Sequence, residues 1–123
     1  MTRNRASAKK AGSSFERQIA DHFAEVIDDR IDRAVKRGTK DVGDIAGLRF
    51  HGQKIAVEVK NTARVDLPTW TKEAEVERQN LGALAAVVIH KRHGVGAPGK
   101  QWVTMTVDDL VALMLERRNV GPE

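Results

Sequence analysis

The chain has 123 residues, and its 21 Lys and Arg residues outnumber 17 Asp and Glu, which gives a formal net charge of +4 at pH 7. This length fits one domain around a single core. The absence of cysteine excludes disulfides and thiolate zinc sites. No run approaches the roughly 18 apolar residues of a membrane span, so we expect a cytoplasmic, intracellular protein without membrane contact. The basic charge favours a polyanionic partner.

The first residues are basic, since Arg3, Arg5, Lys9 and Lys10 occur there and no acid precedes Glu16. We expect residues 1–12 to form a flexible basic arm, residues 13–118 to form a single domain, and residues 119–123 to form a tail.

Helical periodicity begins at Ser13, because Phe15, Ile19 and Phe23 recur every four residues. The stretch from Ser13 to Glu16 has the pattern of a capping box. The charged stretch 28–40 extends this helix until Gly38 ends it.

Two extended runs, 44–50 and 54–61, are separated by His51 and Gly52 and predict an antiparallel hairpin. Asp66 and Pro68 then introduce a second helix, which Gly82 closes.

The remaining elements follow from hydrophobic runs and caps. Residues 83–89 are continuously apolar, which is typical of a strand covered on both faces. Residues 101–105 predict a further strand, and Thr106 caps a last helix over 107–117. This order predicts an α/β fold in which helices flank a mixed central β-sheet.

Charged side chains interrupt the apolar run 54–61. Glu58 and Lys60 share one face of the predicted strand, which in many proteins is merely a solvated ion pair. Asp44 lies opposite Glu58 only if the hairpin loop has an odd number of residues, because a two-residue turn at His51 and Gly52 would direct it to the other face.

Two carboxylates brought together repel each other unless a cation joins them. Their hard oxygen ligands suit Mg²⁺, for which Mn²⁺ is a plausible substitute. Asp41 competes with Asp44 as the ligand, and we prefer Asp44 because the predicted strand follows it directly.

These charges resemble a known motif. Glu16 on the first helix, Gly43-Asp44 on a strand and Glu58-Val59-Lys60 on the next resemble the PD-(D/E)XK nuclease superfamily. Phe15-Glu16-Arg17 is most similar to the archaeal-type Holliday junction resolvases and their phage relatives. The resemblance covers residues 13–102, and Gly43 stands where proline usually precedes the aspartate.

The resemblance implies a restriction-endonuclease-like fold and an Mg²⁺-dependent endonuclease. Asp44, Glu58 and the Val59 carbonyl would hold the metal, and Glu16 would complete the site directly or through water. Lys60 would orient the attacking water or offset charge on the phosphate. An alternative for Glu16 is a purely capping role.

By the same resemblance, the leading substrate is branched DNA such as a Holliday junction, and its two-fold symmetry implies a homodimer. Flaps, nicks or damaged duplex are alternative substrates, and a DNA-binding module without catalysis is an alternative function.

A nucleic acid substrate requires cations around the acidic residues. The candidates for DNA binding are Arg17, Lys36, Arg37, Lys40, Lys72, Lys91 and Arg92. The segment 94–101 nearly matches the phosphate-binding loop of nucleotide hydrolases, but Gln101 replaces the Mg²⁺-ligating hydroxyl and a strand follows instead of a helix. We therefore expect no nucleotide cofactor and interpret this segment as a flexible hairpin loop that contacts DNA phosphates.

Overall fold

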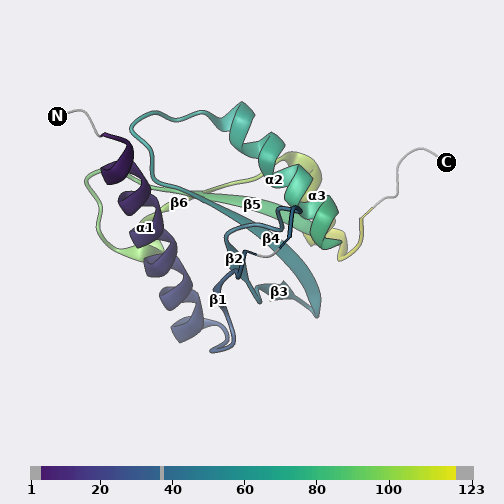
Figure 1. Cartoon of the computed structure of the whole chain (residues 1–123). Helices are drawn as coiled ribbons and strands as arrows, with labels where there is room; N and C mark the ends of the chain where they lie inside the picture. Colours follow the sequence, from purple (N-terminus) through teal and green to yellow (C-terminus); the bar gives the residue numbers. More distant parts are fainter. Residues whose placement is uncertain (1–3, 37, 119–123) are drawn as a thin grey trace.

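A computed structural model describes residues 4–36 and 38–118 (Figure 1). Its elements are α1 (Arg5–Val26), β1 (Asp32–Arg33), β2 (Ile45–Ala46), β3 (Arg49–Phe50), β4 (Gln53–Lys60), α2 (Leu67–Leu81), β5 (Ala85–His90), the short 3₁₀ helix η1 (Pro98–Lys100), β6 (Trp102–Thr104) and α3 (Val107–Leu115). The strand order is β1-β2-β4-β5-β6, with β3 paired to β4 beside this path. β4 and β5 are parallel and the other pairs are antiparallel. The predicted α/β class with a mixed sheet flanked by helices is confirmed.

Helices cover both faces of the sheet, and α1 and α2 lie on opposite sides of the central strands (Figure 1). One apolar cluster joins α1 and α3 to the sheet and includes Ile19 and Val57. The second cluster lies beneath α2 and includes Trp70 and Ala56. Consecutive residues of β4 therefore contribute to opposite faces.

The first helix begins at Arg5, not at Ser13. Asn4 caps it by accepting the Ser7 N–H at 2.8 Å, and the Ser7 hydroxyl accepts the Asn4 N–H at 3.1 Å. This reciprocal pair is a capping box that begins nine residues before the one expected at Ser13. Residues 5–12 of the expected arm are therefore helical, while residues 1–3 and the tail 119–123 lie outside the described residues.

The helix also ends earlier than expected, at Val26. The Asp28 carboxylate accepts the Arg30 N–H at 2.9 Å, a local bond that competes with helix formation. The chain then forms β1, and the Ala34 N–H bonds to the carbonyl of Asp44. The prediction that residues 28–40 continue the helix is therefore wrong.

The later elements agree closely with expectation. Asp66 caps α2 and Gly82 ends it with φ of 69°. All six residues of β5 are buried, as a strand between two helical layers requires. Thr106 caps α3 by accepting the Asp109 N–H.

The hairpin has a two-residue turn, because Phe50 pairs with Gln53 across His51 and Gly52. The odd-numbered loop that was set as the condition for Asp44 to lie opposite Glu58 is therefore not present. Nevertheless, β2 pairs with β4 in a different register, with Ile45 opposite Val57. Continuing the register of β3 and β4 would instead place Ile45 opposite Glu58, one residue further along β4. Gly47, with φ of 94°, supplies the extra residue as a bulge between β2 and β3.

Among the described residues, no helix combines the length and apolarity that crossing a membrane requires.

Candidate active site

The register places two of the predicted carboxylates opposite each other. Extending the pairing of Ile45 with Val57 by one residue sets Asp44 opposite Glu58. Partners across an antiparallel pair share a face, so both side chains lie on the face that α2 covers. The two carboxyl groups are close enough to share a hydrogen bond.

The backbone around Asp44 is fixed by its neighbours. Gly43 is buried with φ of 102°, and a Cβ atom there would lie 2.9 Å from the carbonyl oxygen of Val57. Only glycine allows this close approach without strain. The Asp44 N–H bonds to the same Val57 carbonyl at 2.8 Å, which locks the aspartate at the start of β2.

Both oxygens of Asp44 accept hydrogen bonds. Oδ2 accepts the Val59 N–H at 2.8 Å and Oδ1 accepts from Lys36 Nζ at 3.0 Å. Burial would raise the pKa of Asp44, but hydrogen bonds with Glu58, the Val59 N–H and Lys36 together lower it. Asp44 is therefore an ionised carboxylate.

Glu58 lies in the centre of β4 and is only 5% exposed. Burial, followed by the adjacent carboxyl groups of Asp44 and Glu77, raises the pKa of Glu58 to about 11. Without a cation, Glu58 is therefore protonated at neutral pH. A divalent cation would replace this proton, because it stabilises the ionised form of every carboxylate around it.

Glu77 of α2 is a third carboxylate that the sequence interpretation missed. Its side chain is 1% exposed, and neither of its oxygens has a hydrogen-bond partner. Burial and nearby Asp41 raise the pKa of Glu77 to about 7, although its contact with Glu58 acts in the opposite direction. A buried carboxylate without a donor carries a desolvation cost that a bound cation would offset.

The donor set fits a divalent metal. Asp41, Glu58 and Glu77 each offer one oxygen, and these three oxygens lie within 4.8 Å of one another. Oxygen ligands at 2.0–2.6 Å from one cation lie at most about 5 Å apart. These three residues could hold a metal ion, and Asp41 approaches the cluster from the loop that precedes Asp44.

The Val59 carbonyl faces the same edge as Asp44. Along β4, the main-chain groups of Ile55, Val57 and Val59 bond toward the β2 side, while the carbonyl of Lys60 bonds to Lys91 beyond β5. A residue in a strand directs its N–H and C=O to the same edge. The alternation therefore aims the Val59 carbonyl at the open edge where Asp44 lies.

Lys60 follows Glu58 on the same face and bonds to Glu73 of α2, with Nζ 3.0 Å from Oε2. Burial would lower the pKa of Lys60, but the bond to Glu73 and the charges of Glu58 and Asp44 raise it. The ammonium is therefore charged, with Glu73 as its ion-pair partner and the charges of Glu58 and Asp44 acting on it.

Glu16 approaches from α1, and its Oε1 accepts from Arg33 Nε and Nη2 at 3.3 Å. Burial and the charge of Asp44 raise the pKa of Glu16 against the opposing effect of Arg33. The capping alternative is wrong, because Ser13 lies inside α1. Glu16 is near Asp44 but lies outside the group of three oxygens described above.

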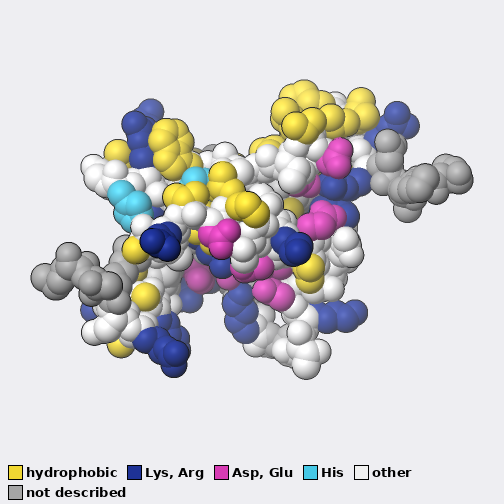
Figure 2. Space-filling model, turned by 90° about the horizontal axis from the view of Figure 1, so that it is seen from above, with side chains coloured by type: hydrophobic (Ala, Val, Ile, Leu, Met, Phe, Trp, Pro, Cys, Tyr) yellow, Lys and Arg dark blue, Asp and Glu magenta, His cyan; other side chains and the backbone are white. Residues whose placement is uncertain are grey.

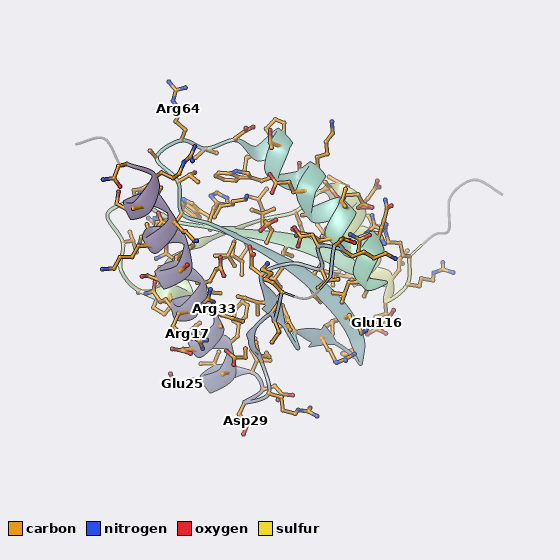
Figure 3. All side chains as sticks on the ribbon, in the orientation of Figure 1. Arg17, Glu25, Asp29, Arg33, Arg64 and Glu116 are labelled. Carbon is orange, nitrogen blue, oxygen red and sulfur yellow. The ribbon has the colours of Figure 1, made fainter. Side chains whose placement is uncertain are left out.

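The predicted DNA-binding cations have different partners. Arg17 of α1 bonds to Asp21 at 3.0 Å and to Asp32 at 2.8 Å, and Arg33 of β1 is labelled next to it (Figure 3). Lys36 bonds to Asp44 and so belongs to the acidic site. Lys40 and Lys72 are exposed, and no ion pair involves them in the described part of the chain. Arg37 lies outside the described residues.

The other two cations are engaged locally. Lys91 donates to the Val95 carbonyl, and the guanidinium of Arg92 lies 4.6 Å from the centre of the Trp102 ring. Seen from above (Figure 2), acidic side chains gather near the middle of the face, with Lys and Arg side chains around them.

The segment 94–101 connects β5 to antiparallel β6, which confirms the expected hairpin. It leads into a strand, as expected, and not into the helix that a phosphate-binding loop requires. Buried Gln101 holds the loop together by donating to the carbonyls of Val95 and Ala97 and accepting the Arg92 N–H.

No protein-family model matches the chain, and no curated protein or solved structure is significantly similar to it. The geometry of the site therefore carries the functional argument.

Proposed function

We propose that the protein is a metal-dependent endodeoxyribonuclease of the PD-(D/E)XK type, with a restriction-endonuclease-like fold. The observation that carries this proposal is the placement of Asp44 opposite Glu58, with Lys60 on the same face of β4. Two carboxyl groups on facing strand positions, with a charged lysine on the same face, are suited to hydrolysing a phosphodiester bond.

In this proposal, Asp44, Glu58 and the Val59 carbonyl bind Mg²⁺, or Mn²⁺ in its place, and Glu16 completes the site directly or through water. When bound, the cation polarises the scissile phosphate and lowers the pKa of water beside it. The fit rests on the hard oxygen donors of Asp44 and Glu58, which lie opposite each other, with Asp44 ionised and Glu58 buried.

The chain's own groups position the reaction. Glu73 holds the Lys60 ammonium at 3.0 Å, where it orients the water or offsets negative charge on the phosphate. Lys36 and the Val59 N–H fix both oxygens of Asp44, so its carboxylate enters the reaction already oriented.

We propose branched DNA, a Holliday junction above all, as the substrate class. Exposed Lys72 on α2 and exposed Lys40 near Asp41 are available for phosphates. The chain has only two Trp, three Phe and no Tyr, so recognition rests on the DNA backbone and shape and not on base stacking.

A junction with two equivalent cutting positions calls for a homodimer, and the second copy has a suitable surface. β6 forms one edge of the sheet, and Val103 beside that edge is 56% exposed. On α3, Leu110 and Met114 are 46% and 74% exposed. An unpaired edge strand and, apart from it, an exposed apolar helix each favour two-fold association.

The dimer is tested by sedimentation velocity of the wild type and of Met114→Asp. We expect the variant to shift toward the monomer, whereas Val76→Asp at an exposed position of α2 should not. A wild type that is monomeric at every concentration would refute the dimer.

The nuclease is tested by incubating labelled junction, flap, nicked and linear duplex DNA with the protein in Mg²⁺ and in EDTA. We expect Mg²⁺-dependent cutting that is fastest on the junction. Glu58→Gln should reduce the rate by at least about 100-fold, because losing a partner that only supports a metal ligand already costs up to about 100-fold and Glu58 is a direct ligand in this proposal. The DNA affinity of the variant should stay nearly normal.

Glu75→Gln is the matched control, because Glu75 lies on α2 but pairs with Arg78. It should cut at the wild-type rate. DNA binding without cutting in any condition would instead support the non-catalytic module, and faster cutting of flaps or nicks would change the substrate but not the chemistry.

A further inference from the structure

The first turns of α1 carry exposed basic side chains that have no partner in the described part of the chain. No Asp or Glu precedes Glu16 in the sequence. Arg5 and Lys9 are exposed, and their side chains form no ion pair or hydrogen bond with another described residue. Unpaired cations of one sign repel each other, and a polyanion relieves this repulsion.

These cations lie on the same face of α1 as Glu16 of the candidate active site. Glu16 follows Arg5 by eleven positions and Lys9 by seven. At about 100° per residue, both spacings return to within about 20° of the same direction. At about 1.5 Å per residue, Lys9 and Arg5 lie about 10 and 16 Å from Glu16 along the helix axis. They therefore continue the side of the helix that faces the site.

Arg64 adds a third cation from the loop between β4 and α2. Figure 3 shows its side chain pointing away from the body of the molecule, and it is exposed without a described partner. The side-chain amide of Asn61, the first residue after β4, donates to the Ala11 carbonyl of α1 at 3.5 Å. This contact places the loop that carries Arg64 beside the first turns of α1, directly after Lys60.

The acidic residue of this loop does not neutralise the three cations. The Asp66 carboxylate accepts the Thr69 N–H and caps α2, and no ion pair joins it to a described cation. Arg5, Lys9 and Arg64 thus form a basic surface at one end of the acidic site, which we call the outer basic surface.

We propose that the outer basic surface binds the phosphate backbone of a DNA arm beyond the cutting position, with the duplex lying along the first turns of α1. This inference rests on the proposed function, because it gives a place to the DNA on either side of the reacting phosphate. One strand of a duplex carries a phosphate for about every 3.4 Å of the axis. Lys9 and Arg5 therefore lie about three and five phosphates from Glu16.

Contacts of this kind position the substrate without reading its sequence. A linear duplex and a branched DNA offer the same phosphates, but the directions of their arms differ. A cationic surface fixed beside the active site therefore favours DNA whose arm leaves the cutting position along α1. The outer basic surface is a means of selecting DNA by its shape.

The first test measures binding of uncut junction DNA in EDTA as the salt concentration rises. The triple variant Arg5→Ala, Lys9→Ala, Arg64→Ala should reduce the slope of log K against log[salt] by about 3, one for each phosphate contact. The charge-conserving variant Arg5→Lys, Lys9→Arg, Arg64→Lys should keep most of the wild-type slope.

Lys10→Ala is the matched control. Lys10 is also exposed and belongs to the same turn, but it lies about 100° from Lys9 around the helix, on the face that carries Arg17. Its replacement removes one positive charge from the same end of the molecule, and the salt slope should stay at the wild-type value.

Ethylation interference on the same DNA locates the contacts. The wild type should require phosphates near the branch and an outer group about three to five phosphates further along one arm. The triple alanine variant should lose the outer group and keep the inner one.

An unchanged salt slope and interference pattern in the triple alanine variant would overturn this inference, and so would an equal loss per charge in Lys10→Ala. Loss of binding to vesicles of phosphatidylcholine and phosphatidylserine, with DNA binding unchanged, would assign the surface to a membrane instead. The nuclease test is separate, because binding is measured without cutting. A chain that cuts DNA while the triple variant keeps the wild-type slope retains the proposed function and loses this surface. A chain that shows the expected loss and cuts nothing retains the surface and loses the nuclease.

Discussion

The two faces of β4 contrast sharply. Toward α1 and α3, Val57 and Val59 are buried among apolar side chains such as Ile19. Toward α2, the same strand presents Glu58 beneath Glu77, two buried carboxyl groups with raised pKa values. The first face contributes hydrophobic stabilisation, and the second reduces stability until a cation arrives. Under the proposed function, the second face gives up folding stability in exchange for metal binding.

The largest effect on stability should come from the apolar face. Ile19→Ala removes a side chain that is 1% exposed, and we expect the free energy of unfolding to fall by about 2–5 kcal/mol. Urea unfolding measures this change. The cutting rate per folded molecule should stay at the wild-type value, and a large loss of cutting by folded protein would show that the two faces are not separate in function.

The charged face should show the reverse pattern. Lys60→Ala should reduce cutting by about 10²–10³-fold, the usual cost of losing one group that stabilises developing charge, while leaving stability nearly unchanged. Single-turnover cleavage of a junction measures the rate. Glu73→Gln should lower the rate less, because it loosens the lysine without removing it. A Lys60→Ala variant that cuts normally would remove this residue from the mechanism.

The pH dependence of stability separates the faces without DNA. The metal-free folded protein retains the Glu77 proton up to a pKa of about 7, whereas the unfolded chain releases it near the ordinary value of 4.5. Because the folded state then binds more protons, the stability of the metal-free protein should fall as the pH rises from about 4.5 to about 7. Glu58 continues this fall at higher pH.

Urea unfolding in EDTA at several pH values measures the slope. Glu77→Gln should make it shallower, whereas Ile19→Ala should shift the whole curve without changing its slope. An unchanged slope in Glu77→Gln would mean that this carboxyl group titrates normally. Saturating Mg²⁺ should reverse the trend in the wild type, because metal binding requires deprotonated ligands.

The smallest effects concern DNA contacts. Lys72→Ala on α2 should reduce the slope of log K against log[salt] by about 1, the value for one phosphate contact. Arg17→Ala on α1 should leave that slope unchanged, because Asp21 and Asp32 already pair with it. Binding of uncut junction DNA in EDTA over a range of salt concentrations measures both, and the opposite result would place the DNA against the face of α1 that carries Arg17.

Sequence patterns identified the elements whose signals are local. The caps at Asp66, Gly82 and Thr106 and the apolar run of β5 all matched the structure. The pattern could not identify β1, because two residues acquire a strand conformation only through their partner β2. It also placed the start of α1 too late by overlooking the capping box formed by Asn4 with Ser7.

At the site, the pairing of Asp44 with Glu58 was reached for the wrong reason. The extra residue lies at the Gly47 bulge and not in the hairpin turn, and an isolated glycine within a strand run was the available signal. Glu77 was missed because its surroundings in the sequence are charged. Its spacing from Trp70 and Ala74 marked it as a core position, and a carboxylate at such a position calls for a partner.

Gly43 has a consequence for engineering this chain by consensus design. In the motif that this chain resembles, a proline usually stands at this position. Proline fixes φ near −65° and lacks an N–H, whereas Gly43 has φ of 102° and donates to Asp41 Oδ1 at 2.9 Å. Gly43→Pro would thus reverse the local backbone and break the tether between the two aspartates. Restoring the commonest residue of a motif would here dismantle the loop that carries it.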